Sequence, residues 1–325
     1  MSGRLLASLM LISSLFLTGI PSLAAGKPET GKPKKVAPAQ GSAKAPEIRR
    51  LTTIQDEKGE KLLRSPLSLA RDEKNGDLIV TSFENGEVVI FDRNGAVITR
   101  MGKTAGLVSP YGVAIDREGR IFVTEVQTGQ LKVFSPGGLL LDRIDLSAAR
   151  GRTVSPGRIM LGPDGLVYVA DLTGNQILVF SPKGDFLRAL GPFAYLQKGG
   201  PTEGGKVVGV SGQGTAVIVY SADGQQLQAF GEHGDESDRN VSFPTGFAID
   251  GRGRLWIADA FQHRLKVFSQ EGKFLFNYGR MQEETGGFFF PVDLCFGENG
   301  ALFVLEKGAN RIQVFQVEDL KGTIK

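Results

Sequence analysis

The sequence predicts an all-β fold, a six-bladed β-propeller of four-stranded antiparallel blades, and three observations lead to it. A strand of the type "VF" recurs six times at intervals of 40 to 48 residues, with its aromatic residue at Phe91, Phe134, Phe180, Tyr220, Phe268 and Phe315. Repeats of roughly 40–45 residues are typical of propeller blades. The first five copies contain turn signals for four short strands, and the segment before the first copy supplies the strand that the sixth copy lacks.

The four strands of a blade can be followed in the fifth copy, "FPTGFAIDGRGRLWIADAFQHRLKVFSQEGKFLFNYG" from Phe243. The first strand follows a proline and ends at an Asp-Gly turn, whose residues tolerate left-handed backbone. The second strand ends in an acid, a polar loop leads to the "VF" strand, and a Gly turn leads to the fourth strand. The fourth copy lacks the proline and the acid, yet "PFAYLQ", "KVVGVS", "TAVIVYS" and "QQLQAFG" still predict four strands. Such β-rich runs between turns predict an antiparallel meander.

The two ends of the repeat region complement each other. The sixth copy ends at "NRIQVFQVEDLKGTIK" without a clear fourth strand, and "IRRLTTIQDEKG" from Ile48 is a strand without a blade. We therefore expect residues Arg49 to Gln55 to pair beside Ile312 to Gln316. The N-terminal strand would then close the last blade and leave no open sheet edge at the junction.

The order of proline, acid–glycine turn, "ADxxxxR" and "VF" resembles the NHL repeat over about residues 48–317. This resemblance implies a propeller whose second-to-third-strand loops and blade connections share one face, around the mouth of a central channel. The NHL family includes RNA-binding and scaffold domains, extracellular sensor domains of bacterial kinases, and relatives that are lyases or lactonases. Because one fold carries all of these activities, function has to be argued from the site.

The N-terminal region predicts export to the periplasm or the extracellular space. Residues 1–24 contain Arg4, an apolar run from Leu5 to Ile20, and small residues before a cleavage site, which together predict a signal peptide. An uncleaved anchor is the alternative, although the run is short for a membrane-spanning helix. Residues 25–46 are rich in Lys, Pro, Ala and Gly and predict a disordered linker, either a spacer or a basic tether to the envelope. The propeller then occupies residues 47–325.

Charge limits the class of partner, and cysteine content limits the disulfides that the chain can form. The formal net charge is +3, and the linker with its five Lys and one Glu accounts for it, so the predicted propeller is nearly neutral and has no basic face for nucleic acid. A single Cys excludes an intramolecular disulfide, and we interpret Cys295 as a small buried thiol. After signal cleavage we expect no transmembrane segment, and a ring that closes on itself predicts a monomer.

Candidate binding residues lie in or beside the loops that the resemblance places at the channel mouth. They are Phe83, Tyr111, Arg158, Tyr195, Phe261, His263 and Asp293. Aromatic and Arg side chains at a surface mark binding hot spots. The alternative is that most of these rings pack between blades, where wedge-shaped contacts need large side chains.

The acids that end the second strands are the candidate metal ligands. A ring of Glu125, Asp171 and Glu306, with Asp259, Asp293 and Asn175 or Asn310 nearby, could hold Ca²⁺ or another divalent metal. The structural interpretation is that each acid caps its loop and meets the residue five positions on. In two copies the residue five positions after the acid is an arginine, Arg264 after Asp259 and Arg311 after Glu306.

Histidine is scarce, with His233 and His263 only, so a zinc site with three protein ligands is not predicted. A His263 general base beside an acid such as Glu306 remains an alternative. The sequence thus favours a secreted, non-catalytic binding or scaffold propeller that presents its loop face to a protein, peptide or glycan and needs no cofactor. The alternative is a metal-dependent lactonase-type hydrolase or lyase with its site at the channel mouth.

Overall fold

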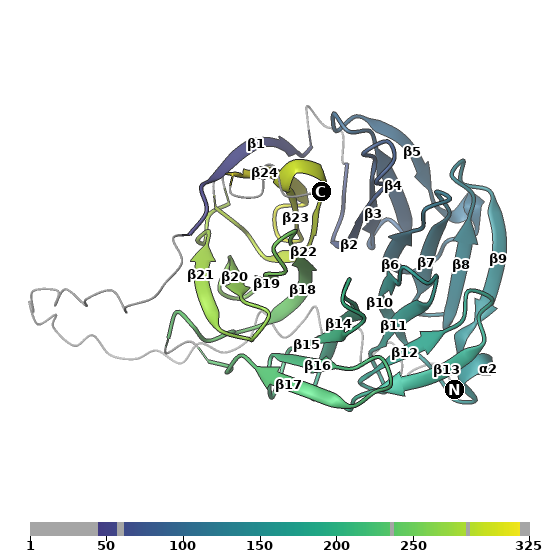
Figure 1. Ribbon diagram of the computed structural model, residues 1–325. Coiled ribbons are helices and arrows are strands. Elements are labelled where there is room, and N and C mark those ends of the chain that lie inside the picture. The colour runs from purple at the N-terminus through teal and green to yellow at the C-terminus, as the bar shows by residue number, and fades with distance from the viewer. Residues whose placement is uncertain (1–44, 57–61, 235–236, 284–286, 319–325) are drawn as a thin grey trace, which may run out of the picture. The chain divides into compact units, whose positions relative to one another are not determined.

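The computed structural model describes residues 45–56, 62–234, 237–283 and 287–318. In these ranges the strands form six four-stranded sheets, which confirms the predicted six-bladed propeller. The sheets are arranged around a common centre, with the first strand of each blade innermost (Figure 1). The predicted signal peptide and residues 25–44 of the predicted linker lie outside the described residues.

Blades 1 to 3 follow the predicted repeats. Blade 1 consists of β2 (Pro66–Arg71), β3 (Leu78–Ser82), β4 (Glu87–Phe91) and β5 (Val97–Met101). Blade 2 consists of β6 (Pro110–Ile115), β7 (Ile121–Glu125), β8 (Gln130–Phe134) and β9 (Leu140–Asp145). Blade 3 consists of β10 (Pro156–Leu161), β11 (Val167–Asp171), β12 (Gln176–Phe180) and β13 (Phe186–Leu190). Connections between blades carry the 3-10 turn η1 (Lys103–Ala105) and the short helix α2 (Leu146–Arg150).

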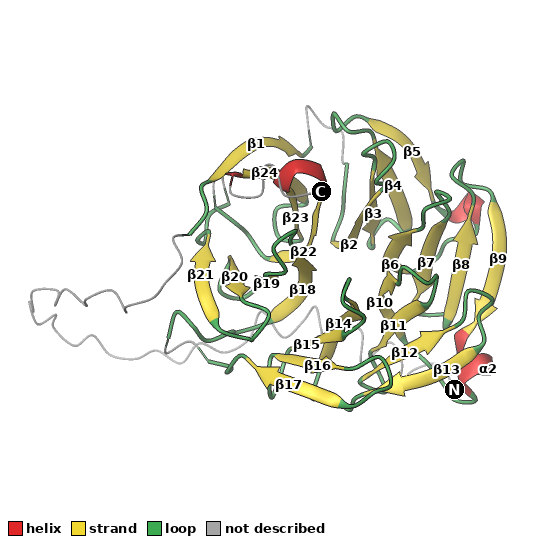
Figure 2. Cartoon of the chain, in the orientation of Figure 1, coloured by secondary structure: helices red, strands yellow, loops and turns green. Residues whose placement is uncertain are grey.

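Blades 4 to 6 complete the ring. Blade 4 consists of β14 (Leu196–Pro201), β15 (Val207–Ser211), β16 (Val217–Tyr220) and β17 (Gln226–Phe230). Blade 5 consists of β18 (Pro244–Ile249), β19 (Leu255–Asp259), β20 (Arg264–Phe268) and β21 (Phe274–Tyr278). Blade 6 consists of β22 (Pro291–Phe296), the 3-10 turn η2 (Glu298–Gly300), β23 (Ala301–Glu306), β24 (Arg311–Val317) and β1 (Ile48–Ile54). Helices are rare and short beside the strands (Figure 2).

The predicted closure of the ring is confirmed. Strand β1 pairs antiparallel with β24, from Ile48 opposite Val317 to Ile54 opposite Ile312, with one bulge between Arg50 and Thr52. The fourth copy also forms a full blade, but its first strand begins at Leu196, later than "PFAYLQ" predicts. The backbone N–H of Tyr195 is instead bonded to the Ser211 hydroxyl, which holds that segment on the loop side of the blade.

The core lies between blades. One apolar cluster joins Trp256 and Leu265 of blade 5 to Leu294, Val304 and Phe315 of blade 6, and similar clusters join other neighbours. Alternate residues of a strand point to opposite faces, so each sheet buries apolar residues against the blades on both sides. Outer strands retain exposed apolar residues such as Leu227, 48% exposed. No helix in the described ranges is long and apolar enough to span a membrane.

Candidate functional site

The second-to-third-strand loops lie beside the starts of the first strands, as the resemblance implies. In blades 2 to 6 the loop donates a backbone hydrogen bond to the residue that precedes the first strand. Gly212 N–H bonds the Tyr195 carbonyl at 2.7 Å, Ala260 N–H bonds the Phe243 carbonyl at 3.0 Å, and Lys307 N–H bonds the Phe290 carbonyl at 2.9 Å. We call the side of the ring that carries these segments the loop face.

The residue that ends each second strand caps the backbone of its own blade. Asp259 accepts the backbone N–H groups of Ser242 at 2.8 Å and Phe243 at 3.0 Å, and Glu306 accepts that of Phe289 at 2.7 Å. Glu125 and Asp171 accept the backbone N–H groups of Ser109 and Ser155 in the same way. In blades 1 and 4 the hydroxyl oxygens of Ser82 and Ser211 accept the equivalent backbone N–H groups, those of Arg64 and Tyr195. The acids are therefore structural caps, since buried N–H groups need a partner.

The side-chain partners of these acids vary from blade to blade. Glu306 pairs with Arg311, Nε to Oε1 at 2.9 Å, as the five-residue spacing predicts. The corresponding expectation for Asp259 and Arg264 is wrong, because Arg264 pairs with Asp238 at 2.9 Å instead. The connection before blade 5 brings Asp238 to the Arg264 guanidinium, while Asp259 is occupied by backbone donors.

The candidate metal ligands do not come together as a cation site in the ranges described. Glu125, Asp171 and Glu306 end strands in three different blades, and each directs its oxygens to backbone donors and to a Lys or an Arg. Within the described residues no group of three His, Cys, Asp or Glu could hold a metal ion. These residues in this arrangement thus do not fit a bound divalent metal.

A charged cluster lies at the axis of the ring, formed by inner-strand residues of three blades. Asp293 of blade 6 is fully buried and accepts the Lys198 ammonium of blade 4 at 2.7 Å. Arg158 of blade 3 crosses to blades 1 and 6, where it donates to the carbonyls of Leu67 and Val292, both at 3.1 Å, and lies 4.0 Å from Asp293. We call Arg158, Lys198 and Asp293 the axial cluster.

The axial cluster leaves one positive charge in excess. Arg158 is 2% exposed and Lys198 is 6% exposed, and Asp293 is the carboxylate that both approach. Asp293 also accepts from the backbone of Leu69 and the hydroxyl of Ser68, both of blade 1. Buried charges persist where they are paired and hydrogen-bonded, so this cluster joins four of the six blades.

Six aromatic rings form a continuous arc on the loop face of blades 4 to 6. The rings are Tyr195, Phe243, Phe261, Phe290, His263 and Phe289. Phe243 and Phe261 stack with centroids 4.6 Å apart, and His263 stacks on Phe289 at 5.6 Å. Phe261 is 46% exposed, so this aromatic arc reaches solvent at its middle. The arc contains three of the predicted binding residues: Tyr195, Phe261 and His263.

His263 occupies a position, four residues after the end of the second strand, that has left-handed backbone in five of the blades. The equivalent residues are Gly86, Gly129, Asn175 and Asn310. Asn175 and Asn310 use their amide oxygens to accept a backbone N–H of the next blade, at 3.0 and 2.8 Å. His263 does the same with Nδ1, which accepts the Phe290 N–H at 3.1 Å. His263 therefore replaces an Asn as the link between blades 5 and 6.

This hydrogen bond determines the tautomer of His263. Burial lowers the pKa of the imidazole, opposed by the carboxylate of Asp259, so the ring is neutral at pH 7. With Nδ1 accepting from a backbone N–H, the proton of the neutral ring lies on Nε2. Acting as a general base would require His263 to break its bond to Phe290.

The remaining predicted binding residues lie apart from the arc. Phe83 and Tyr111 form an edge-to-face pair with centroids 6.2 Å apart. The Tyr111 ring lies 5.9 Å from the Arg158 guanidinium, so this pair adjoins the axial cluster. Arg158 and Asp293, expected at the mouth, are buried within that cluster. Burial raises the pKa of the Cys295 thiol to about 12, which keeps it protonated.

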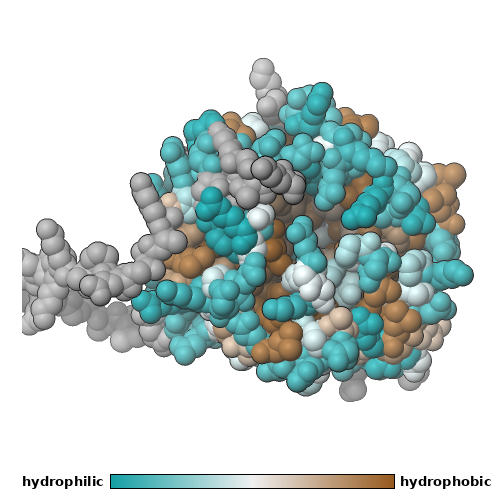
Figure 3. Space-filling model, in the orientation of Figure 1, coloured by the Kyte–Doolittle hydropathy of each residue, from teal (hydrophilic) through white to brown (hydrophobic). Residues whose placement is uncertain are grey.

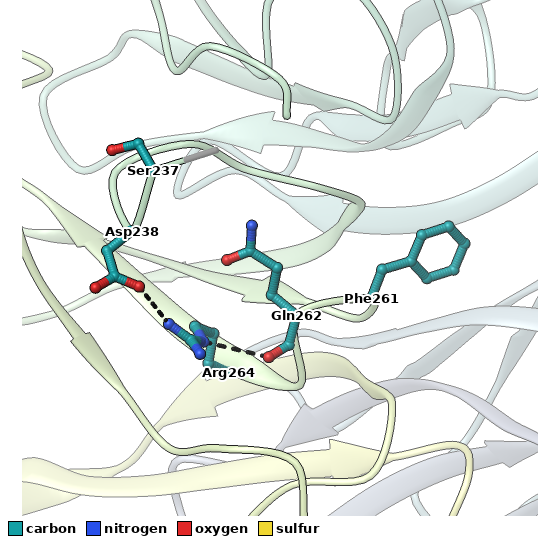
Figure 4. Close-up of a pocket in the computed structure, with 5 residues that line it drawn as sticks. All are labelled: Ser237, Asp238, Phe261, Gln262 and Arg264. Atoms are coloured by element: carbon teal, nitrogen blue, oxygen red, sulfur yellow. Dashed lines mark hydrogen bonds and ion pairs between the residues drawn. The ribbon is translucent and has the colours of Figure 1, made fainter. Parts of the chain in front are cut away.

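A pocket of about 320 Å³ adjoins the arc at blade 5. It is lined by Ser237, Asp238, Phe261, Gln262 and Arg264. Arg264 bonds Asp238 and the carbonyl of Gln262, and the Phe261 ring extends away from that pair (Figure 4). The polar wall of this pocket is thus internally paired, while Phe261 belongs to the arc. Hydrophilic residues dominate the visible face of the ring, with hydrophobic groups between them (Figure 3).

Sequence reasoning missed two residues of this region: Lys198 and Phe243. Phe243 precedes the proline of its blade as Phe290 does, so this signal was visible. Lys198 matches the positions of Arg158 and Asp293, but the fourth copy lacks the proline that would align it.

Known proteins share the fold of this chain. A gluconolactonase from Xanthomonas campestris superposes with a TM-score of 0.63 at 17% identity, covering 87% of this chain and 99% of that one. A catalytically inactive virginiamycin B lyase from Staphylococcus aureus with quinupristin gives 0.58 at 14%, covering 80% and 82%. A structural genomics protein of unknown function from Bacteroides thetaiotaomicron gives 0.66 at 14%, covering 83% and 76%. Identities this low show the fold alone.

Similarity in sequence to a known protein covers a smaller part of the chain than similarity in fold. Protein brain tumor from Drosophila melanogaster is 27% identical over 88 residues, which is 26% of this chain and 8% of that protein. The match therefore spans a small part of that relative. No model of a known protein family matches the chain.

Proposed function

We propose that this protein is a non-catalytic binding propeller whose loop face holds a protein, peptide or glycan partner through the aromatic arc. The observation that carries the proposal is the exposed middle of the arc, where Phe261 stacks on Phe243 and is 46% exposed. Large aromatic side chains dominate binding energy where they are well packed and reach a surface. A stacked ring supported from beneath also loses little conformational freedom when a partner covers it.

The surroundings of the arc support this role. Loop glycines lie directly against its rings: a Cβ on Gly212 would lie 2.8 Å from both Tyr195 and Phe243. The loop of blade 4 thus approaches both rings too closely for any side chain. The arc is held on one side by such backbone contacts and is open on the other at Phe261.

The experiment is a peptide and glycan array probed with the wild-type protein and with Phe261→Ala. We expect the variant to bind the ligands of the wild type at least about tenfold more weakly. Truncating a hot-spot aromatic residue costs about 2 kcal/mol or more of binding free energy. Leu139→Ala is the matched control, because Leu139 is 69% exposed and lies in the turn before β9. Equal binding by wild type and Phe261→Ala would rule out the arc as the binding surface.

A lactonase-type hydrolase or lyase is the second candidate. Its support is the likeness of fold to a gluconolactonase and a virginiamycin B lyase. Against it, the acids cap backbone N–H groups, and His263 Nδ1 is already bonded to the Phe290 N–H. Metal content and melting temperature with and without EDTA separate the two candidates, since a bound ion stabilises the folded state. A stoichiometric ion with a large drop in melting temperature would favour the enzyme.

Export is part of the proposal. The support is the apolar run before residue 24 together with the small residues that follow it. N-terminal sequencing of the protein from its native source tests it, and a mature chain that begins at Ala25 is the expected result.

A further inference from the structure

The pocket at blade 5 lies between two loops that are tied to each other. Its wall consists of Ser237, Asp238, Phe261, Gln262 and Arg264, and its volume is about 320 Å³ (Figure 4). Small-molecule sites occupy roughly 300–1,000 Å³, so this volume suits one small unit of a ligand and not an extended chain. The Gln262 amide donates to the carbonyls of Gly234 at 3.3 Å and Asn240 at 3.4 Å, which fixes the connection before blade 5 against the loop of that blade.

Asp238 is positioned by contacts of both its backbone and its side chain. Its carbonyl accepts the Lys266 ammonium at 2.9 Å and the Asn277 amide at 2.8 Å. Lys266 is fully buried in β20, so this contact anchors the connection on the blade. The Asp238 carboxylate then meets the Arg264 guanidinium, Oδ1 to Nη1 at 2.9 Å. The two groups therefore form a preorganised polar wall, which a ligand need not order when it binds.

The ion pair in this wall leaves hydrogen-bonding groups for a ligand. It joins one oxygen of Asp238 to one nitrogen of Arg264, and Arg264 Nε donates to the Gln262 carbonyl at 3.2 Å. Among the described residues, Asp238 Oδ2 and Arg264 Nη2 have no hydrogen-bond partner. The Asp238 side chain is 84% exposed and that of Arg264 is 27% exposed, so a ligand can reach both. An acceptor beside a donor matches neighbouring hydroxyl groups, since each hydroxyl both donates and accepts.

The charges connected to the pocket balance within the described part of the chain. The cation Arg264 pairs with Asp238, and the cation Lys266 lies against the Asp238 carbonyl. Asp259, whose carboxylate accepts the Gln262 N–H at 3.3 Å, supplies the second negative charge. Two cations thus accompany two carboxylates, and this balance favours a neutral ligand over an acidic or a basic one.

The remaining wall of the pocket is the ring of Phe261, which is 46% exposed and stacks on Phe243. A matching ligand presents an apolar surface to this ring and several hydroxyls to the ion pair. A pyranose ring has this form, with C–H groups on its face and hydroxyls at its edge. An amino-acid side chain carries at most one hydroxyl, so the pocket favours a sugar over a peptide side chain.

We infer that this pocket binds one neutral hexopyranose unit of a glycan, with its hydroxyls on Asp238 and Arg264 and its apolar face beside Phe261. The inference deepens the proposed function, on which it rests for the loop face being the binding surface. It selects a glycan among the proposed partners.

Titration of the isotope-labelled protein with methyl glucoside, methyl galactoside and methyl mannoside, followed by NMR of its side-chain N–H groups, tests the inference. We expect at least one sugar to shift the signals of the Gln262 amide and Arg264 Nε at millimolar concentration. Asp238→Asn keeps the shape of the side chain and removes its charge, so it should weaken binding of that sugar at least about tenfold. Because Arg264 is then unpaired, the variant should bind methyl glucuronide, an acidic sugar, more tightly than the wild type does. Asp142→Asn is the matched control, since Asp142 is exposed in β9 of blade 2.

The outcomes separate the sugar site from the proposed function. Absence of a shift with all three sugars, or equal affinity of the wild type and Asp238→Asn, overturns the sugar site. Tighter binding of methyl glucuronide than of any neutral sugar by the wild type also overturns it, in favour of an acidic ligand. Loss of array binding in Phe261→Ala without any sugar shift would keep the proposed function and remove the sugar site. Sugar shifts at Gln262 with array binding that Phe261→Ala leaves unchanged would contradict the arc and leave the sugar site on the ion pair.

Discussion

The ends of the second strands and the axial cluster both occupy positions that repeat in each blade, yet they behave differently. At the strand ends all six residues, four acids and two serines, accept a backbone N–H of their own blade. At the axis the equivalent residues are Ser68, Gly112, Arg158, Lys198, Gly246 and Asp293, and the four that carry side chains beyond Cα make different side-chain contacts. A repeated residue with a repeated contact serves the fold, whereas a repeated position with unlike residues is where specific chemistry can arise.

Breaking the axial cluster should have the largest effect on stability, and Asp293→Ala tests this. The variant leaves Lys198 and Arg158 buried without their carboxylate, so we expect a loss of about 3–5 kcal/mol in the free energy of unfolding. Urea denaturation measures it. The double variant Lys198→Met/Asp293→Ala should recover part of that loss, because one unpaired cation is removed. If the single and double variants are equally unstable, the charges are not what joins the blades.

A capping acid should tolerate replacement by serine, the residue that occupies the same position in blades 1 and 4, and Asp259→Ser tests this. Serine already performs the same task at Ser82 and Ser211, so we expect a loss of about 1 kcal/mol. Asp259→Ala leaves the N–H groups of Ser242 and Phe243 without their acceptor and should cost about 2 kcal/mol or more. Equal losses for Ser and Ala, measured by urea denaturation, would contradict the capping role.

His263→Asn should have the smallest effect, because Asn175 and Asn310 make the same link between blades. At about pH 8 we expect the stability to lie within roughly 1 kcal/mol of the wild type. The folded pKa of His263 lies below that of the unfolded chain, so the unfolded chain takes up the proton first as the pH falls. The stability due to neutral His263 is present above about pH 6.5 and is lost as the pH falls below it.

The wild type should therefore lose more stability than His263→Asn between about pH 8 and pH 5, measured by urea denaturation at each pH. A difference between the two proteins that does not change with pH would show that His263 has no lowered pKa. It would also weaken the assignment of its proton to Nε2.

Much of the fold was predictable because local chemistry recurs. Turn residues and strands repeat at a nearly constant period, and each copy confirms the others. Even the closing strand could be predicted, since a blade without an outer strand and a strand without a blade complement each other. The shifted start of β14 shows the limit, because the fourth copy lacks the proline that marks the other first strands.

The sequence by itself determined the number of blades, their strand order and the closure of the ring, and the resemblance to the NHL repeat added the face on which the loops gather. Only the tertiary structure decided that Arg264 pairs with Asp238, and that Arg158, Lys198 and Asp293 meet at the axis. The physical reason is that period and turn chemistry act within one blade, whereas these contacts join residues up to 135 positions apart. Their partners depend on how the ring closes, and no local pattern records that.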